Sequence, residues 1–166
     1  MAADPRLRGL PEAVEVTLFR IIDQTIRADP IVRSQVKIIK SWEGSASDKI
    51  PPSIGQSPYV RLTPMGSPEQ WWSSDSQIGS LTIFVEMMVE GSCSDDIANL
   101  WFAIKRSQYP SDLPSRNAYI SRLQAAGAHK GILSFTAPAF DVDGGEDNKF
   151  HATAQMKIDY RVNYWS

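Results

Sequence analysis

Residues 150–165 read Phe-His-Ala-Thr-Ala-Gln-Met-Lys-Ile-Asp-Tyr-Arg-Val-Asn-Tyr-Trp, and apolar and polar side chains alternate along almost the whole stretch. A period of two over this length predicts one long β-strand with a buried face and a solvent-facing face. At about 3.3 Å per residue, the strand would be roughly 50 Å long. A globular domain of this size is only about 40 Å across. We therefore expect the strand to reach a partner outside its own domain.

Composition limits the classes of protein that the chain can represent. Its 166 residues predict a single domain over residues 1–166. The formal net charge of -2 disfavours a surface built to grip nucleic-acid phosphates. Cys93 is the only cysteine, so an intramolecular disulfide and a thiolate zinc site are not expected, which suits a reducing cytoplasm. The N-terminus lacks the apolar core of a signal peptide, and no apolar run approaches the ~20 residues of a membrane span.

Helical periodicity predicts two main helices. The first has apolar residues at every fourth position and runs from Pro11 to Arg27, where Asp29-Pro30 ends it. The second begins after an N-cap at Ser94 and has Asp95 and Asp96 in its first turn, where acidic side chains complement the helix dipole. A weaker third helix is predicted from Arg116 to Ala126, with Gly127 as its C-cap.

Alternation predicts the remaining strands. They are Val32–Trp42, Pro58–Thr63, Gly79–Glu90 and Lys130–Phe140, with irregular stretches at 44–57 and 64–77. The polar connection 141–148 would join the fourth of them to the long last strand in an antiparallel hairpin. The predicted fold class is therefore α+β: a mostly antiparallel sheet of about five strands, two main helices packed on one face, and a long C-terminal β-hairpin.

No catalytic signature emerges. The chain has no nucleophile elbow, no phosphate-binding loop and no dinucleotide-binding glycine motif. His129 and His151 could approach one another in the predicted hairpin, and the loop Asp141–Asp147 could add a carboxylate, which would suit a small metal-dependent hydrolase. Histidines at strand ends and a solvated turn explain the same residues without a site. We expect no catalytic residue, no metal ligand and no cofactor.

Aromatic residues in polar surroundings indicate an interface instead. Trp71 and Trp72 occupy a predicted loop, and Tyr164 and Trp165 lie in the last three residues. Tryptophan and tyrosine are enriched at interface hot spots, although loop tryptophans can also fold back onto their own core. Outward-facing cations of the last strand could pair with a neighbour's acidic groups or could be solvated. The candidate interface residues are Trp71, Trp72, Lys157, Arg161, Tyr164 and Trp165.

The order of these segments resembles the tail terminator, or tail completion, proteins of long-tailed bacteriophages. The resemblance covers nearly the whole chain and rests on architecture and loosely matching segments, because no invariant motif defines the family. The matching segments are the strand Val36–Trp42, the short strand Tyr59–Leu62, the strand Leu81–Val89, the acidic-capped helix Ser94–Trp101 and the final hairpin Gly131–Tyr164.

The resemblance implies a structural protein of the virion, in the tail or neck, that is assembled in the host cytoplasm and is not an enzyme. Such proteins form a ring, typically a homohexamer, on the last ring of a finished tail tube. The ring stops polymerisation of the tube protein and joins the tail to the head connector, while genome DNA passes through without specific binding. Copies related by rotation make head-to-tail contacts that close. Another neck protein of the same fold, such as a head-completion stopper, remains an alternative.

Overall fold

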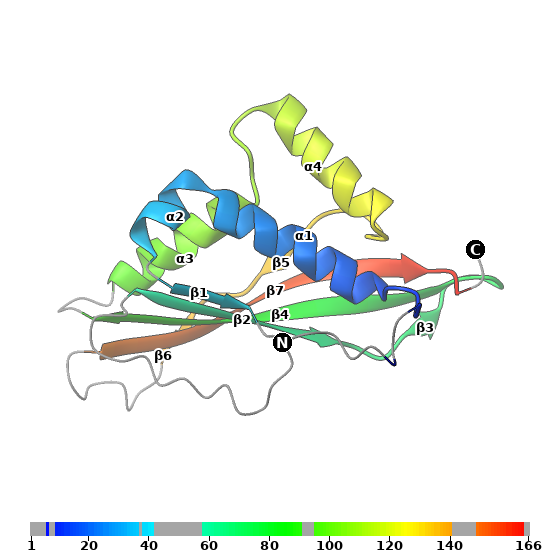
Figure 1. The fold of residues 1–166 in the computed structure, drawn as a ribbon, viewed down its shortest axis with the longest axis horizontal. Helices are drawn as coiled ribbons and strands as arrows, with labels where there is room; N and C mark the ends of the chain where they lie inside the picture. Colours follow the sequence, from blue (N-terminus) through cyan, green and yellow to red (C-terminus); the bar gives the residue numbers. More distant parts are fainter. Residues whose placement is uncertain are drawn as a thin grey trace.

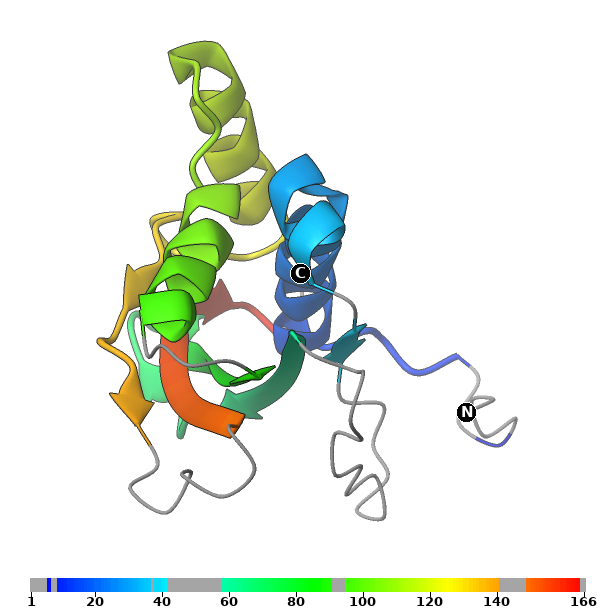
Figure 2. The same ribbon diagram turned by 90° about the vertical axis from the view of Figure 1, so that its left-hand side faces the viewer.

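The computed structural model describes Arg6 and residues 9–36, 38–41, 58–90, 95–140 and 149–164. Its helices lie on one face of a twisted sheet (Figures 1 and 2). The helices are α1 (Val14–Ala28), α2 (Pro30–Gln35), α3 (Asp95–Ser107) and α4 (Leu113–Ala125). The strands are β1 (Ile38–Ser41), β2 (Tyr59–Gly66), β3 (Gln70–Trp71), β4 (Gln77–Glu90), β5 (Ser134–Phe135), β6 (Ala139–Phe140) and β7 (Lys149–Val162). None of these helices is long and apolar enough to cross a bilayer.

The sheet confirms the predicted α+β class. Its strand order is β1-β2-β4-β7-β5, with β3 beside β4 and β6 beside β7. The β1–β2 pair is parallel, and every other pair is antiparallel. α1 and α3 are the main helices against the sheet, and their apolar stripes form a continuous core with the inner face of the strands.

The last strand has a full-length partner inside its own domain, so its length does not by itself require an outside one. β7 is a central strand and pairs with β4 along its whole length, from Gln77↔Val162 to Glu90↔Lys149. Both strands have 14 residues, so each is paired with the other along one whole edge. β2 covers β4 only from Leu81 to Met88. The β4–β7 ribbon therefore extends past β2 at both ends.

The period-two pattern correctly identified the inner face of β7. The buried side chains alternate along the strand, and they meet equally buried side chains of β4 and of the helices. The buried residues of β7 are Ala152, Ala154, Met156, Ile158 and Tyr160. Trp101 of α3 is also buried, and its Nε1 donates a hydrogen bond to the carbonyl of Thr136 at 3.0 Å.

The predicted strand Val32–Trp42 is wrong in its first half. Asp29-Pro30 ends α1, as predicted, but it also begins α2. The Asp29 side chain accepts hydrogen bonds from the N–H groups of Ile31 and Val32, each at 3.0 Å, and Pro30 occupies the first turn. This local capping outweighs the strand preference of the β-branched residues that follow. Trp42 and the loop 44–57 lie outside the described residues.

The stretch 64–77 is more regular than predicted. β2 continues to Gly66, and a second strand, β3, returns along the same edge of β4. The N–H of Ser67 donates to the carbonyl of Ser80 at 3.0 Å, and the N–H of Ser80 donates to Oγ of Ser67 at 2.9 Å. The length of β4 explains why residues 64–77 are regular. The edge of β4 that extends past β2 offers backbone hydrogen-bonding groups to the segment that lies beside it.

The predicted strand Lys130–Phe140 is broken into β5 and β6. The register shifts by one residue between Phe135↔Met156 and Ala139↔Thr153, so the outer chain has one extra residue there. Pro138 lies in this gap and has no N–H to donate. The connection 141–148 lies outside the described residues.

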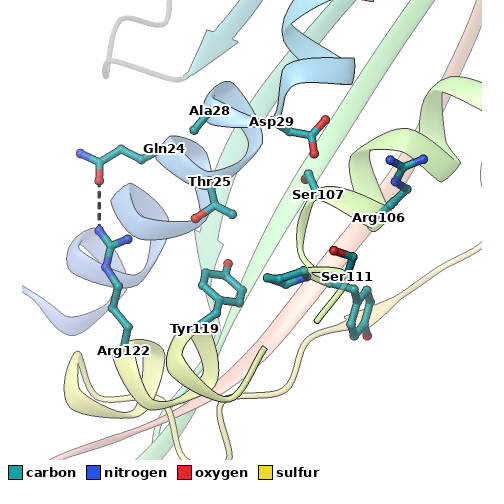
Figure 3. A pocket seen from close by; sticks show the side chains of 11 residues that line it. Gln24, Thr25, Ala28, Asp29, Arg106, Ser107, Ser111, Tyr119 and Arg122 are labelled. Atoms are coloured by element: carbon teal, nitrogen blue, oxygen red, sulfur yellow. Dashed lines mark hydrogen bonds between the residues drawn. The ribbon is translucent and has the colours of Figure 1, made fainter. Parts of the chain in front are cut away.

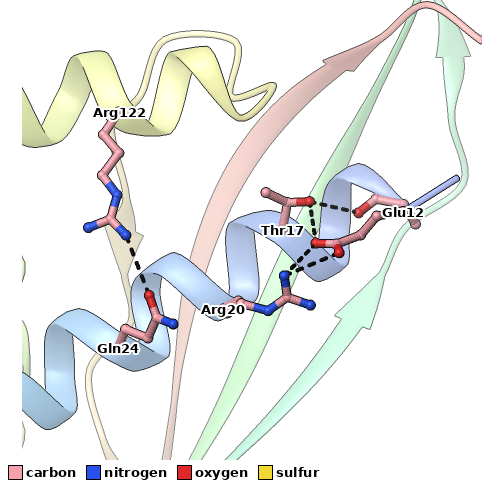
Figure 4. Close-up of polar contacts among 6 residues, drawn as sticks. Glu12, Thr17, Arg20, Gln24 and Arg122 are labelled. Atoms are coloured by element: carbon pink, nitrogen blue, oxygen red, sulfur yellow. Dashed lines mark hydrogen bonds and ion pairs between the residues drawn. The ribbon is translucent and has the colours of Figure 1, made fainter. Parts of the chain in front are cut away.

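Helix α4 stands away from the sheet (Figures 1 and 2). It begins three residues before the predicted start, because Asp112 caps it by accepting from the N–H of Ser115 at 2.9 Å. It ends as predicted before Gly127, which has a positive φ of 115°. Its buried residues are Tyr119 and Leu123. Nη2 of Arg122 also reaches Oε1 of Gln24 on α1 at 3.4 Å (Figure 4).

Tyr119 should make stability fall in alkaline solution. Burial raises the pKa of Tyr119 to about 12, and its hydroxyl donates to Oε1 of Gln108. Above about pH 10 the unfolded chain loses this proton while the folded chain keeps it. The free energy of unfolding should therefore fall between about pH 10 and 12, by up to about 1.4 kcal/mol per pH unit from this group. Urea unfolding at a series of pH values should show a shallower fall for Tyr119→Phe, and an unchanged slope would contradict the assignment.

Candidate functional site

Most of the predicted interface residues meet at the end of the sheet that carries β3 (Figure 1). Trp71 of β3 pairs with Gln77 of β4, and the next residue of β4, Ile78, pairs with Arg161 of β7. The chain then reaches Tyr164, whose side chain is exposed. We call this region the hairpin end and define it as residues 67–78 together with Arg161 and Tyr164.

The turn at the tip of the hairpin end is ordered by its own hydrogen bonds. The N–H groups of Trp72 and Ser73 both donate to the carbonyl of Ser76, at 3.0 and 3.2 Å. Oγ of Ser73 donates to Oδ1 of Asp75 at 2.6 Å. This hydrogen bond lowers the pKa of Asp75. The tip therefore presents a fixed carboxylate that is ionised at neutral pH.

Two indole rings are exposed on this ordered turn. Trp71 is 72% exposed and Trp72 is 55% exposed. Trp72 makes an edge contact with His129, with 4.9 Å between ring centroids. Neither ring folds back into the core, which was the alternative for loop tryptophans. Large apolar side chains exposed together on a rigid support are typical of interaction sites.

A tyrosine–carboxylate cluster fixes the hairpin end to the body. The hydroxyl of Tyr160 lies 2.6 Å from Oε1 of Glu15 on α1 and 3.1 Å from Oε1 of Glu69 before β3. Tyr164 donates a further hydrogen bond to the other oxygen of Glu69. Burial raises the pKa of Tyr160, and the hydrogen bond to Glu15 and the charge of that residue raise it further. Tyr160 therefore stays a neutral donor and joins three parts of the chain.

A methyl group at Gly79 should break this cluster. An added Cβ would lie 2.6 Å from Oη of Tyr160 and 3.1 Å from Cγ of Glu69. We expect Gly79→Ala to lower the free energy of unfolding by about 1–3 kcal/mol, since overpacking forces these side chains to move. The matched control is Gly66→Ala, because its Cβ would meet only Oε1 of Glu15, at 4.0 Å. Chemical denaturation compares the two variants, and equal stabilities would contradict the packing described.

The other predicted interface residues are placed less closely together. Nε of Arg161 donates to Oγ of Ser76 at 3.0 Å, which holds its guanidinium against the hairpin end. Lys157 is exposed four residues before Arg161 on β7, opposite Thr82 of β4, on the face without helices. Trp165 lies outside the described residues. The structure thus groups Trp71, Trp72, Arg161 and Tyr164, whereas Lys157 belongs to the open face of the sheet.

The two histidines of the hydrolase alternative do not meet. The N–H of His129 donates to the carbonyl of Asp159, whereas His151 lies opposite Met88. Asp159 and His151 are eight residues apart on one strand, or roughly 26 Å. The approach of the two histidines, which the sequence left open as an alternative, does not occur, because residues 128–135 pair with the C-terminal half of β7. Within the described ranges, no three histidine, cysteine, aspartate or glutamate residues are grouped to hold a metal ion.

A cleft of about 810 Å³ separates α4 from α1 and the end of α3 (Figure 3). Arg122 extends along one side toward Gln24, and Arg106 lies on the other side near Asp29. The hydroxyls of Thr25 and Ser107 are used within their own helices, since they donate to the carbonyls of Ile21 and Ile104. The polar groups of the cleft therefore do not converge on one point where a small ligand would bind.

Two acidic residues of the hairpin end, Glu69 and Asp75, were not predicted from the sequence. The sequence does contain a signal for an acidic segment, because residues 67–78 include these two carboxylates and no lysine or arginine. The link from Glu69 to Tyr160 and Tyr164 has no such signal, since it joins residues that are about ninety positions apart.

Comparisons with known proteins support the fold. No protein-family model matches the chain, and no curated protein sequence matches it. A solved structure does match: a chain of the "Virion of native gene transfer agent (GTA) particle" superposes with a TM-score of 0.58. The match covers 92% of this chain and 100% of that chain, at 14% sequence identity. At this identity the likeness establishes a shared fold.

Proposed function

We propose that this chain is a non-enzymatic structural protein of a phage-like virion. The observation that carries the proposal is the likeness of its fold to a chain of the gene transfer agent virion over 92% of this chain and all of that one. The exposed aromatic pair at the hairpin end also supports it, since a protein that works by assembly must present such a surface.

In the same proposal, copies of the chain close into a ring, a hexamer by resemblance to tail terminators, at the head-facing end of the tail tube. The ring binds the tail tube protein on one side and the head–tail connector on the other, and it stops further growth of the tube. Genome DNA passes through its centre without being gripped. The net charge of -2 agrees with this role, because a strongly basic lumen would retain phosphates.

Deleting the gene from the producing strain tests the proposal. Electron micrographs of the particles should show overlong tails without heads, and expression of the chain in trans should restore tails of uniform length. Tails of normal length that fail to join heads would favour a head-completion stopper instead. Normal, complete particles would contradict a structural role in tail completion.

A further inference from the structure

A second exposed apolar surface lies on the flank of the molecule where α3 runs beside β5 (Figure 2). The side chains of Phe102, Lys105 and Arg106 follow one another at helical spacing along α3, and Tyr109 follows in the turn after the helix. Phe102 is 63% exposed and Tyr109 is 50% exposed. We call this surface the α3–β5 flank: these four residues together with Ile132 and Phe135.

Aromatic contacts hold the flank together. The ring centroids of Tyr109 and Phe135 lie 5.8 Å apart, and the buried Trp101 also contacts Phe135, with 5.9 Å between ring centroids. Nζ of Lys105 lies 5.7 Å from the centre of the Trp101 ring. Ile132, just before β5, is 62% exposed. The flank is therefore a preformed surface of exposed apolar groups on packed elements, with cations along its rim.

The charges of the flank and of the hairpin end are opposite. Residues 102–111 and 130–140 contain Lys105, Arg106 and Lys130 and no acidic residue. Residues 67–78 contain Glu69 and Asp75 and no basic residue. Among the described residues, no ion pair joins a carboxylate to Lys105 or Arg106 of the flank or to the neighbouring Lys130, although Arg106 lies near Asp29 across the cleft (Figure 3). The flank thus carries cations beside its exposed apolar side chains. The hairpin end carries Glu69 and Asp75 against the single cation Arg161 and is net negative, so the net charges of the two surfaces are complementary.

We propose that the hairpin end of one copy docks on the α3–β5 flank of the next copy, with Trp71 and Trp72 against Phe102 and Tyr109. The inference rests on the ring of the proposed function and specifies its contact. The two surfaces are different, so the contact is head-to-tail: each copy uses its hairpin end on one side and its flank on the other. Such heterologous contacts close into a ring when the rotation permits.

Charge exchange between the surfaces tests the contact. Asp75→Lys and Arg106→Asp, each made alone, should weaken self-association by about tenfold or more, and the two combined should restore it to near the wild-type level. Arg33→Glu, an exposed charge reversal on α2, is the matched control and should change nothing. Sedimentation velocity over a range of concentrations measures the association, and circular dichroism confirms that each variant is folded. Failure of the combined variant to recover would overturn the contact.

Mixing two disabled variants gives a second, independent test. One carries Trp71→Ala and Trp72→Ala, and the other carries Phe102→Asp and Arg106→Asp, so each retains one intact surface. Alone, both should remain monomers; mixed, they should form one-to-one dimers and no larger species. A flank variant that still assembles with itself would overturn the proposal, because hairpin ends would then bind one another.

The two proposals fail differently. Wild-type rings on tail tubes with no response to these substitutions would overturn the docking contact and leave the proposed function intact. A wild-type chain that stays monomeric, both alone and with tail tubes, would overturn the docking contact and the ring together.

Discussion

Replacing Trp71 and Trp72 with alanine together is expected to weaken self-association by at least about a hundredfold. Both rings are exposed in the isolated chain, at 72% and 55%, so they contribute little to its own core. They sit on a turn that the carbonyl of Ser76 and the side chain of Asp75 hold in place. A rigid aromatic loses little conformational entropy on binding, which is why truncating tryptophan at an interface centre costs about 2 kcal/mol or more per residue.

The folded chain itself should tolerate this double substitution. Surface truncations usually change the free energy of unfolding by less than about 0.5 kcal/mol, and the contact of Trp72 with His129 is the ring contact that is lost. Val16→Ala on α1, another half-exposed apolar residue, is the matched control and should assemble like the wild type. Sedimentation velocity measures the self-association of both variants. If the tryptophan variant sediments like the wild type, the hairpin end is not an interface.

The second large effect concerns the strand pair that organises the fold. Ile158 of β7 is 2% exposed and lies opposite Leu81 of β4 in the middle of the sheet. Ile158→Asp would bury a carboxylate among apolar side chains without a partner, at a cost of several kcal/mol. Domains of this size are stable by only about 5–15 kcal/mol in total. We expect the variant to lose cooperative unfolding near room temperature.

The adjacent residue provides a matched control. Lys157 faces the side of the sheet without helices and is exposed, so Lys157→Asp introduces the same side chain on the same strand but into water. Its free energy of unfolding should change by less than about 1 kcal/mol. Thermal unfolding followed by circular dichroism compares the two variants. A comparable loss of stability in both variants would mean that the buried and exposed faces of β7 are assigned incorrectly.

The sequence predicts the central strands well because the alternation of apolar and polar residues continues over many positions. A period-two pattern across fourteen residues leaves few alternatives, and the buried and exposed faces of β7 agree with it. The two amphipathic helices were identified for the same reason. The length of β7 does not by itself require a partner outside the domain, because β4 is equally long and pairs with it.

The structure of short elements depends on local hydrogen bonding, which the periodicity of apolar residues does not reveal. Asp29-Pro30 signals the end of one helix, and the same side chain caps the next, so Val32 lies in a helix instead of the predicted strand. Pro138 interrupts a stretch whose composition is otherwise strand-like. In both cases a single cap or a single missing N–H outweighs the preferences of several neighbouring residues.

The candidate site was only partly visible in the sequence. Adjacent tryptophans in a polar segment mark Trp71 and Trp72 without any structure. The position of His129 depends on the register of the chain against β7, which is set by the pairing of Ala128 with Tyr160, residues far apart in the sequence. The α3–β5 flank was missed because Phe102 lies on a helix whose inward stripe already accounts for its apolar content, and Tyr109 lies just after that helix. Their exposure is a property of the packed molecule.

The most direct experiment adds the purified chain to growing tail tubes from the same particle and images them by electron microscopy. Tubes should stop elongating, and each should carry a ring of extra density at one end. The Trp71→Ala, Trp72→Ala variant should leave growth unchanged and both tube ends bare. Tubes that elongate at the same rate with the wild-type chain, without density at either end, would contradict the proposed role in tail completion.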